Sequence, residues 1–267
     1  MTTRRKYLTA AAIVVVVGVL CLGYGYFIEP HRLVVNESEV RIKGWNKAFD
    51  GFRIVAISDI HGGSHGGDEI QIRRVVEMAN KQNADIIVLL GDYVSQKREN
   101  VPIRQRGLKM EPSAIVENLR GMRAKYGVFA VLGNHDEWFN GGAVARELES
   151  VGYQVLDGKL AFVNLPNGNR LRILGLRDHT TMNSWGAFSN NAKALLAPSE
   201  GQGDVIILQH SPDILPAITD GLAISADQKL LLTGHTHGGQ IRLPIIGAPV
   251  VPSMFGQKFV GGHAKEG

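Results

Sequence analysis

The sequence predicts an α/β domain that follows a single apolar N-terminal helix. Three features lead to this expectation: an uncharged apolar run near the N-terminus, short β-branched runs after it, and helical patterns between those runs. Hydrophobic residues are 44% of the 267 residues and charged residues 20%, so the chain can bury a core and is not disordered throughout. A single cysteine excludes an intrachain disulfide framework and any cysteine-rich zinc module.

Residues 1–28 predict a membrane anchor. Leu8 to Ile28 carry no charge, and about 20 apolar residues are enough to span a bilayer. Arg4, Arg5 and Lys6 precede the run, which places the N-terminus in the cytoplasm and the rest outside. Thr3–Leu8 also resembles a twin-arginine export signal, although a basic segment before any anchor has the same composition. No Ala-x-Ala cleavage site follows, so we expect an uncleaved single-pass helix.

The net charge of +4 comes mostly from this N-terminal tip, which supplies three basic residues and no acidic one. The rest of the chain is nearly balanced. Its one cluster of basic residues, 120–125, is expected to form the C-terminal half of a helix. Proteins that bind nucleic acid usually show a concentrated basic face, so we expect no nucleic-acid binding.

After a connector, residues 29–49, one domain is expected over residues 50–267. Short apolar β-branched runs predict strands that are buried on both faces. These runs are Arg53–Ser58, Ile86–Leu90, Val128–Leu132, Val205–Leu208 and Leu230–Thr233. Val155–Val163 and Leu171–Leu176 flank Asn167-Gly168 and predict a hairpin. Helical spacing places two apolar sets on helix faces: Ile72, Val75, Val76 and Ala79, and then Ile115, Leu119 and Met122.

Each of the five strand runs is followed by side chains that suit a divalent cation. The loops carry, in order, Asp59 and His61; Asp92; Asn134, His135 and Asp136; His210; and His235 with His237. Sites in α/β sheets form beyond the carboxyl ends of strands, so these side chains are expected to converge. An extended strand end would point Asp59 and His61 to the same side, and likewise His235 and His237.

The mixture of carboxylate, imidazole and amide oxygen favours Mn, Fe, Zn or a similar metal. Each block alone is a weak signal, but the ordered set is a strong one. Two such cations, roughly 3.5–4 Å apart, clamp the oxygens of an in-line phosphoryl displacement and make hydroxide from water. With Asp59 and Asp92 as the anionic ligands, the surplus positive charge matches a hydroxide and a phosphodiester monoanion.

Over roughly residues 50–245 these five blocks resemble the calcineurin-like metallophosphoesterases. The resemblance implies a four-layer α/β/β/α sandwich of two mixed sheets. It also implies one metal held by Asp59, His61, Asp92 and His237, and a second held by Asp92, Asn134, His210 and His235. By the same resemblance His135 is not a ligand: it faces the phosphate, stabilises the transition state or protonates the leaving group, and is oriented by Asp136.

The stretch Gly234–Pro244 and the anchor resemble a bacterial subgroup of membrane-associated or twin-arginine-exported phosphodiesterases, related to UDP-2,3-diacylglucosamine hydrolases. This implies a lipid-linked phosphodiester or pyrophosphate substrate, attacked by metal-bound hydroxide, at the bacterial cell membrane. An extracytoplasmic domain could not reach a UDP-linked precursor, which favours a phospholipid or a wall-linked diester. Nucleotide or phosphoprotein substrates, and a catalytically silent membrane-anchored binding module, are the alternatives. The oligomeric state is not predicted.

Several other residues carry weaker expectations. Trp138 and Phe139 follow the Asn-His-Asp turn and are packing residues or an apolar wall beside the metals. His65 is a solvated loop residue or a substrate contact, and Arg177 is expected in a salt bridge. The apolar loop 243–251 is expected either near the membrane or buried against the sheet.

Overall fold

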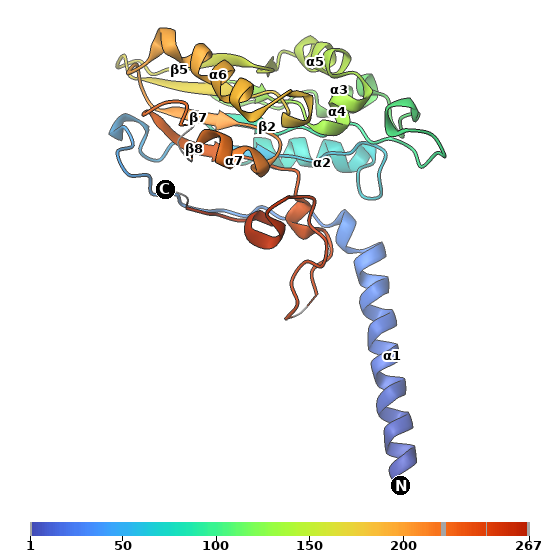
Figure 1. The fold of residues 1–267 in the computed structure, drawn as a ribbon. Helices are drawn as coiled ribbons and strands as arrows, with labels where there is room; N and C mark the ends of the chain where they lie inside the picture. Colours follow the sequence, from blue (N-terminus) through green and yellow to red (C-terminus); the bar gives the residue numbers. More distant parts are fainter. Residues whose placement is uncertain (1, 220–222, 244, 266–267) are drawn as a thin grey trace. The chain divides into compact units, whose positions relative to one another are not determined.

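The computed structural model describes residues 2–219, 223–243 and 245–265, and it divides the chain into two compact units. The first unit ends at Ser38 and the second begins at Glu39. Figure 1 shows the helix of the first unit in blue, and the second unit runs from lighter blue through green and yellow to red.

The first unit is built on one long helix, α1 (Thr3–Phe27), followed by the short η1 (Glu29–His31). The span Thr3–His31, 29 residues that include both elements, is long and apolar enough to cross a membrane, by length and composition. None of the α1 side chains is buried within this structure. A helix that is apolar on every side has no face suited to water. A signal sequence shares these properties, so the helix is a candidate for either role.

The second unit contains two sheets of four strands each. The first sheet has the order β1-β2-β3-β4, with the strands β1 (Ile54–Ile57), β2 (Ile86–Leu89), β3 (Val128–Ala130) and β4 (Gln154–Val155). Its neighbours pair in parallel. Parallel strands bring their carboxyl ends to one edge of the sheet, and that edge carries the loops with Asp59, Asp92 and Asn134.

The second sheet has the order β5-β6-β7-β8, with the strands β5 (Lys159–Asn164), β6 (Arg170–Gly175), β7 (Val205–Leu208) and β8 (Gln228–Leu232). The hairpin β5-β6 is antiparallel, as predicted, and turns through Gly168 at positive φ. The pairs β6-β7 and β7-β8 are parallel. The second sheet is therefore mixed, as expected, whereas the described pairs of the first sheet are all parallel.

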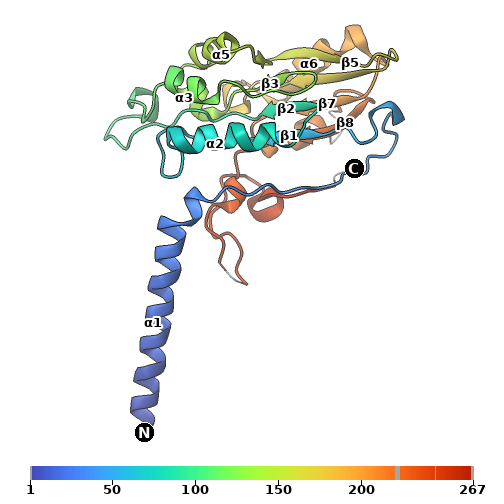
Figure 2. The same cartoon turned by 180° about the vertical axis from the view of Figure 1, so that it is seen from behind.

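Helices cover the outer face of each sheet, as the two opposite views in Figures 1 and 2 show. Beside the first sheet lie α2 (Glu69–Asn80), α3 (Pro112–Leu119), α4 (Asn134–Phe139) and α5 (Gly141–Ser150). Beside the second lie α6 (Trp185–Leu196) and α7 (Leu215–Ile218). Short 3-10 turns connect them: η2 (Lys47–Phe49), η3 (Ile103–Gln105), η4 (His179–Thr181), η5 (Ala197–Ser199), η6 (Pro212–Ile214), η7 (His237–Gly239) and η8 (Gly256–Phe259).

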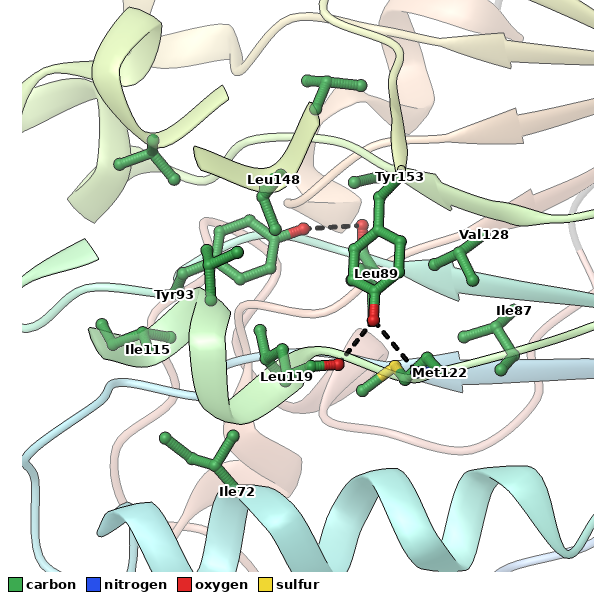
Figure 3. Close-up of a cluster of buried hydrophobic side chains, with 14 of the residues drawn as sticks. Ile72, Ile87, Leu89, Tyr93, Ile115, Leu119, Met122, Val128, Leu148 and Tyr153 are labelled. Atoms are coloured by element: carbon green, nitrogen blue, oxygen red, sulfur yellow. Dashed lines mark hydrogen bonds between the residues drawn. The ribbon is translucent and has the colours of Figure 1, made fainter. Parts of the chain in front are cut away.

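Three apolar cores lie between the four layers. In the outer core drawn in Figure 3, Ile72 of α2 and Leu148 of α5 are buried with Leu89 of β2. The central core joins the sheets through Val88 and Phe129 on one side and residues such as Ile173 and Ile206 on the other. The third core places Phe188 and Leu196 of α6 against the second sheet. The predicted four-layer α/β/β/α sandwich is confirmed.

One helical expectation is wrong. Residues 120–125 are not the second half of a helix, because α3 ends at Leu119 and a turn follows. Gly121 has φ +93°, which ends helical geometry there. Met122 is still buried in the outer core, where the Tyr153 hydroxyl accepts a hydrogen bond from its backbone N–H (Figure 3).

Candidate metal centre

The loops that follow β1, β2, β3, β7 and β8 bring the predicted side chains together. Three overlapping groups form, each with ligand-type atoms that lie within 4.8 Å of one another. The first cluster is Asp59, His61 and His237, and the second cluster is Asp92, His210 and His235. The third group combines His61 and Asp92, one from each cluster, with His135. Both sheets contribute to both clusters, so the centre exists only when the sandwich is assembled.

In the first cluster the Asp59 carboxylate lies between two imidazoles. Its Oδ1 is 3.4 Å from Nε2 of His237 and 3.8 Å from Nε2 of His61. The two rings are stacked, with centroids 5.0 Å apart. The Asp59 and His61 side chains are 10% and 14% exposed and His237 is 30% exposed, so this cluster opens to solvent on the His237 side.

The second cluster is buried more deeply. Oδ2 of Asp92 lies 3.2 Å from Nε2 of His210, and that nitrogen is 3.1 Å from Nδ1 of His235. Asp92 and His210 are 1% and 0% exposed. The same Oδ2 is 3.6 Å from Nε2 of His61, so Asp92 connects the two clusters.

Hydrogen bonds on the far side of two imidazoles determine which nitrogen faces the clusters. Nδ1 of His210 lies 2.7 Å from the Leu90 carbonyl, and Nδ1 of His61 lies 3.2 Å from the Val94 carbonyl. A carbonyl oxygen only accepts, so both Nδ1 atoms carry the proton and donate. The Nε2 atoms are therefore directed at the carboxylates, which is the orientation of metal-binding histidines.

One atom in the first cluster is left without a hydrogen bond. Oδ1 of Asp59 is buried and has no hydrogen-bond partner, although the other oxygen of the carboxylate accepts from the backbone N–H of His235. An unsatisfied buried carboxylate oxygen is costly, and a cation placed among Asp59, His61 and His237 would satisfy it. The residues present thus fit a divalent cation of the borderline class.

The backbone of these loops is unusual. Five of the predicted ligands have positive φ angles: Asp59 (57°), His61 (43°), Asp92 (57°), His235 (70°) and His237 (51°). Asp59 and His61 do converge with each other, but not through an extended strand end, which was the reason expected. Left-handed backbone at residues other than glycine costs free energy and concentrates at functional sites.

Two glycines let the loops approach closely. A Cβ on Gly133 would lie 2.6 Å from the backbone nitrogen of Asp92. A Cβ on Gly234 would lie 2.8 Å from Oδ2 of Asp59 and closer still to the Ser58 hydroxyl. Larger residues at either position would push apart the loops that hold the clusters.

The charged groups of the second cluster shift one another's pKa values. Burial favours a raised pKa for Asp92, but His210, His135 and His61 outweigh it and hold this pKa well below the usual range. Burial conversely lowers the pKa of His210, yet Asp92 and then Asp59 raise it to about 10. Without a cation, the deep site therefore contains an ion pair between His210 and Asp92.

His135 lies beside the clusters, with its ring centroid 4.9 Å from that of His61. Oε1 of Gln96 is 2.5 Å from its Nδ1, and Nε2 of Gln96 donates to the His135 carbonyl at 2.9 Å. These two bonds fix the amide orientation and place the ring proton on Nδ1. Burial, the largest cause, lowers the pKa of His135 to about 4. No local sequence pattern singles out Gln96, because its contact with His135 joins residues 39 positions apart.

Asp136 was expected to orient His135, but the observed ring partner of His135 is Gln96. The Asp136 carboxylate is fully buried and accepts hydrogen bonds from the backbone N–H groups of Asp92, Tyr93, Val94 and Gly133. It therefore joins the loop after β2 to the loop after β3. Burial and the nearby Asp92 raise the pKa of Asp136 to about 7, although the amides oppose the rise.

The other residues singled out in the sequence differ in where they lie relative to the clusters. Asn134 is buried at the first position of α4, two residues before Asp136. The Trp138 ring lies 4.8 Å from the His135 ring, so it borders the centre, and Phe139 is 38% exposed. Arg177 forms the expected ion pair, 3.2 Å from Asp157. His65 is exposed in the loop between β1 and α2.

Comparison with known proteins identifies the fold family. The profile described as calcineurin-like phosphoesterase matches residues 52–239, which include all five loops of the centre. The chain belongs to this family. Membership makes it a metal-dependent phosphoester hydrolase, in agreement with the clusters described above.

Individual relatives of this calcineurin-like phosphoesterase are similar over nearly the whole chain. The metallophosphoesterase YkuE of Bacillus subtilis is 29% identical over 272 residues, covering 99% of this chain and 87% of its own. Phosphodiesterase YaeI of Escherichia coli is 27% identical, with 94% and 84% covered. A transmembrane protein with a metallophosphoesterase domain from Danio rerio is 25% identical, and the match covers 87% of this chain and 50% of that protein.

Proposed function

We propose that this protein hydrolyses a phosphodiester or pyrophosphate bond of a lipid-linked substrate at two divalent cations. The observation that carries the proposal is the convergence of carboxylate and imidazole atoms into two clusters joined by Asp92. A pair of cations is suited to in-line displacement at phosphorus, because both the attacking and the leaving oxygen need stabilisation. The relative named phosphodiesterase YaeI supports a diester substrate.

The ligand sets follow the clusters. One cation would be held by Asp59, His61, His237 and Asp92, and the other by Asp92, His210, His235 and the amide oxygen of Asn134. Asp92 is shared because its Oδ2 faces both His61 and His210. Mn, Fe and Zn all accept this mixture of oxygen and nitrogen donors.

The cations would supply positive charge to the phosphoryl oxygens and lower the pKa of a water molecule. His135 acts on the substrate. Gln96 accepts from its Nδ1 and leaves Nε2 free to face the phosphoryl group. A phosphate anion nearby raises the pKa of this imidazole, which favours a proton on Nε2 that can bond or protonate the leaving oxygen. Trp138 covers one side of the ring and limits its contact with water.

The lipid-linked part of the proposal rests on the first unit. Helix α1 is long and apolar enough to span a bilayer, and basic residues precede its apolar run. A relative is described as a transmembrane protein with a metallophosphoesterase domain. With the N-terminus in the cytoplasm of a bacterium, the second unit lies outside, brought there by the twin-arginine or another route. A phospholipid or a wall-linked diester then fits better than a cytoplasmic UDP-linked precursor.

The test is hydrolysis of bis(p-nitrophenyl) phosphate by the full chain with Mn²⁺. We expect turnover that Asp92→Asn abolishes, because both cations lose their shared ligand. Asp50→Asn is the matched control, since Asp50 is exposed at the end of η2. Absence of turnover while metal is bound, with any divalent cation tried, would reject the proposal.

A further inference from the structure

Residues 241–243 and 245–254, called here the apolar loop, expose an unusual number of large apolar side chains. The exposed fractions are Ile241 67%, Leu243 43%, Ile245 108%, Ile246 64%, Val250 78% and Met254 64%. Among the described residues of the second unit, only six other large hydrophobic side chains are exposed, and they are scattered from Val40 to Trp185. Exposed apolar groups concentrated in one short segment mark an interaction surface.

The apolar loop is held in this conformation by its base. Leu243 and Gly247 exchange backbone hydrogen bonds of 2.8 and 3.0 Å, which form a narrow turn with Ile245 at positive φ. Ala248 is 2% exposed and packs on Gly239, where a Cβ would collide with it. The apolar side chains are therefore presented to solvent by an anchored backbone, and burial against the sheet, one of the two expectations for this loop, does not occur.

The far end of the apolar loop is tied to the second sheet. The Asp213 carboxylate, in η6 after β7, accepts from the Met254 N–H at 3.0 Å and from the Ser253 hydroxyl at 2.5 Å. Asp213 is 6% exposed. This buried acceptor keeps the segment after Val250 close to the loop after β7, which carries His210. Figures 1 and 2 both show the orange-red segment after β8 projecting from the layered part of the second unit.

The charged side chains of the chain segment that carries the apolar loop have one sign. Residues 228–265 contain no aspartate or glutamate, and they include Lys229, Arg242, Lys258 and Lys265. Arg242 lies inside the loop and is exposed. Exposed apolar side chains whose charged neighbours in the sequence are all cationic suit a bilayer surface with anionic headgroups. A protein interface would instead offer a rim of mixed polar groups around its apolar centre.

We propose that the apolar loop inserts into the headgroup region of a lipid bilayer and forms a membrane contact distinct from α1. The loop begins two residues after the turn η7, which contains the first-cluster residue His237. Insertion would therefore bring the solvent-open side of that cluster to the membrane surface. Residues 32–46 form no helix or strand, and such a stretch extends to at most about 50 Å, so the connection does not prevent the contact.

The experiment measures contact of the apolar loop with acyl chains in the full chain, reconstituted in vesicles of phosphatidylcholine and phosphatidylglycerol. Cys21, the one cysteine, is replaced in Cys21→Ala, and Ile246→Cys is labelled with an NBD fluorophore. Ile70→Cys is the matched control, because Ile70 in α2 is also 64% exposed. We expect a blue shift at position 246 and quenching by lipids brominated on the acyl chain, with neither effect at position 70.

A second variant tests whether the apolar side chains of the loop cause the contact with lipid. Ile245→Glu places a charge on the most exposed side chain and should reduce the quenching at position 246, as should omission of phosphatidylglycerol. Equal quenching at positions 246 and 70, or none at either, would overturn the proposal. Energy transfer between labels on two copies without quenching by lipid would show self-association and would also overturn it. The readout needs no turnover, so it does not depend on the proposed function.

Discussion

At the scale of single residues, the centre combines strained backbone with tightly held side chains. Five of the predicted ligands have left-handed φ angles, each at a cost of about 1–3 kcal/mol. The hydrogen bonds of Asp136 to four backbone amides hold one of these loops in place. The strain is maintained because the bonds around it are buried and mutually dependent.

Gln96 is expected to act only through His135. Gln96→Leu removes the acceptor for Nδ1, and turnover of bis(p-nitrophenyl) phosphate should fall about 10–100-fold with metal content unchanged. His135→Ala should lower turnover by about 10²–10⁴-fold, also with the metals retained.

A double variant tests whether Gln96 acts on turnover by positioning His135. On the His135→Ala background, Gln96→Leu should have no further effect on turnover, and Gln105→Leu, an exposed control, should have none on either background. Additive losses would show that Gln96 works independently of His135. Loss of metal in His135→Ala would make His135 a ligand.

Metal binding should release a proton from His210. In the metal-free chain, Asp92 raises the pKa of His210 to about 10 against the opposing effect of burial, so this imidazole is protonated at neutral pH. A cation must displace that proton, and affinity should therefore strengthen by about tenfold per pH unit up to about pH 10 and weaken as the pH falls. Calorimetric titration with Mn²⁺ in buffers of different ionisation enthalpy measures the proton count. An affinity that does not change with pH would contradict the assignment.

At the scale of elements, the loops after the strands are positioned by close backbone contact. Gly234→Ala should weaken metal binding, because the new Cβ would collide with Ser58 and Asp59 and displace the loop of the first cluster. Gly186→Ala in α6 is the control. Its Cβ meets no atom within 4 Å, and helix propensity predicts a gain of about 0.5–1 kcal/mol in unfolding free energy. Thermal melting and Mn²⁺ titration of both variants test this. Equal metal affinity in the two would contradict it.

Local sequence patterns predicted most of these elements. The β-branched runs and the hairpin at Asn167-Gly168 correspond to observed strands, since burial and turn chemistry act over a few residues. Long-range contacts were not predictable in this way. Gln96 reaches His135 across 39 positions, and the partners of Asp136 are amides of a distant loop. The left-handed angles at Asp59 and His61 likewise arise from tertiary contacts, because neither residue type prefers them strongly.

At the scale of the whole molecule, the sandwich brings ligands from two sheets to one place. Asp59 and Asp92 follow strands of the first sheet, whereas His210, His235 and His237 follow strands of the second. The central core between the sheets sets the distance between these loops. Metal binding should therefore also stabilise the folded second unit, since the ligands are dispersed when the chain unfolds.

Elemental analysis of the full chain purified with excess Mn²⁺ tests the paired-cation claim most directly. We predict about two metal ions per chain, about one after His237→Ala, which removes a ligand of the first cluster alone, and fewer than one after Asp92→Asn. A single ion in the unmodified protein, or an Asp92→Asn variant that keeps both ions, would contradict the account.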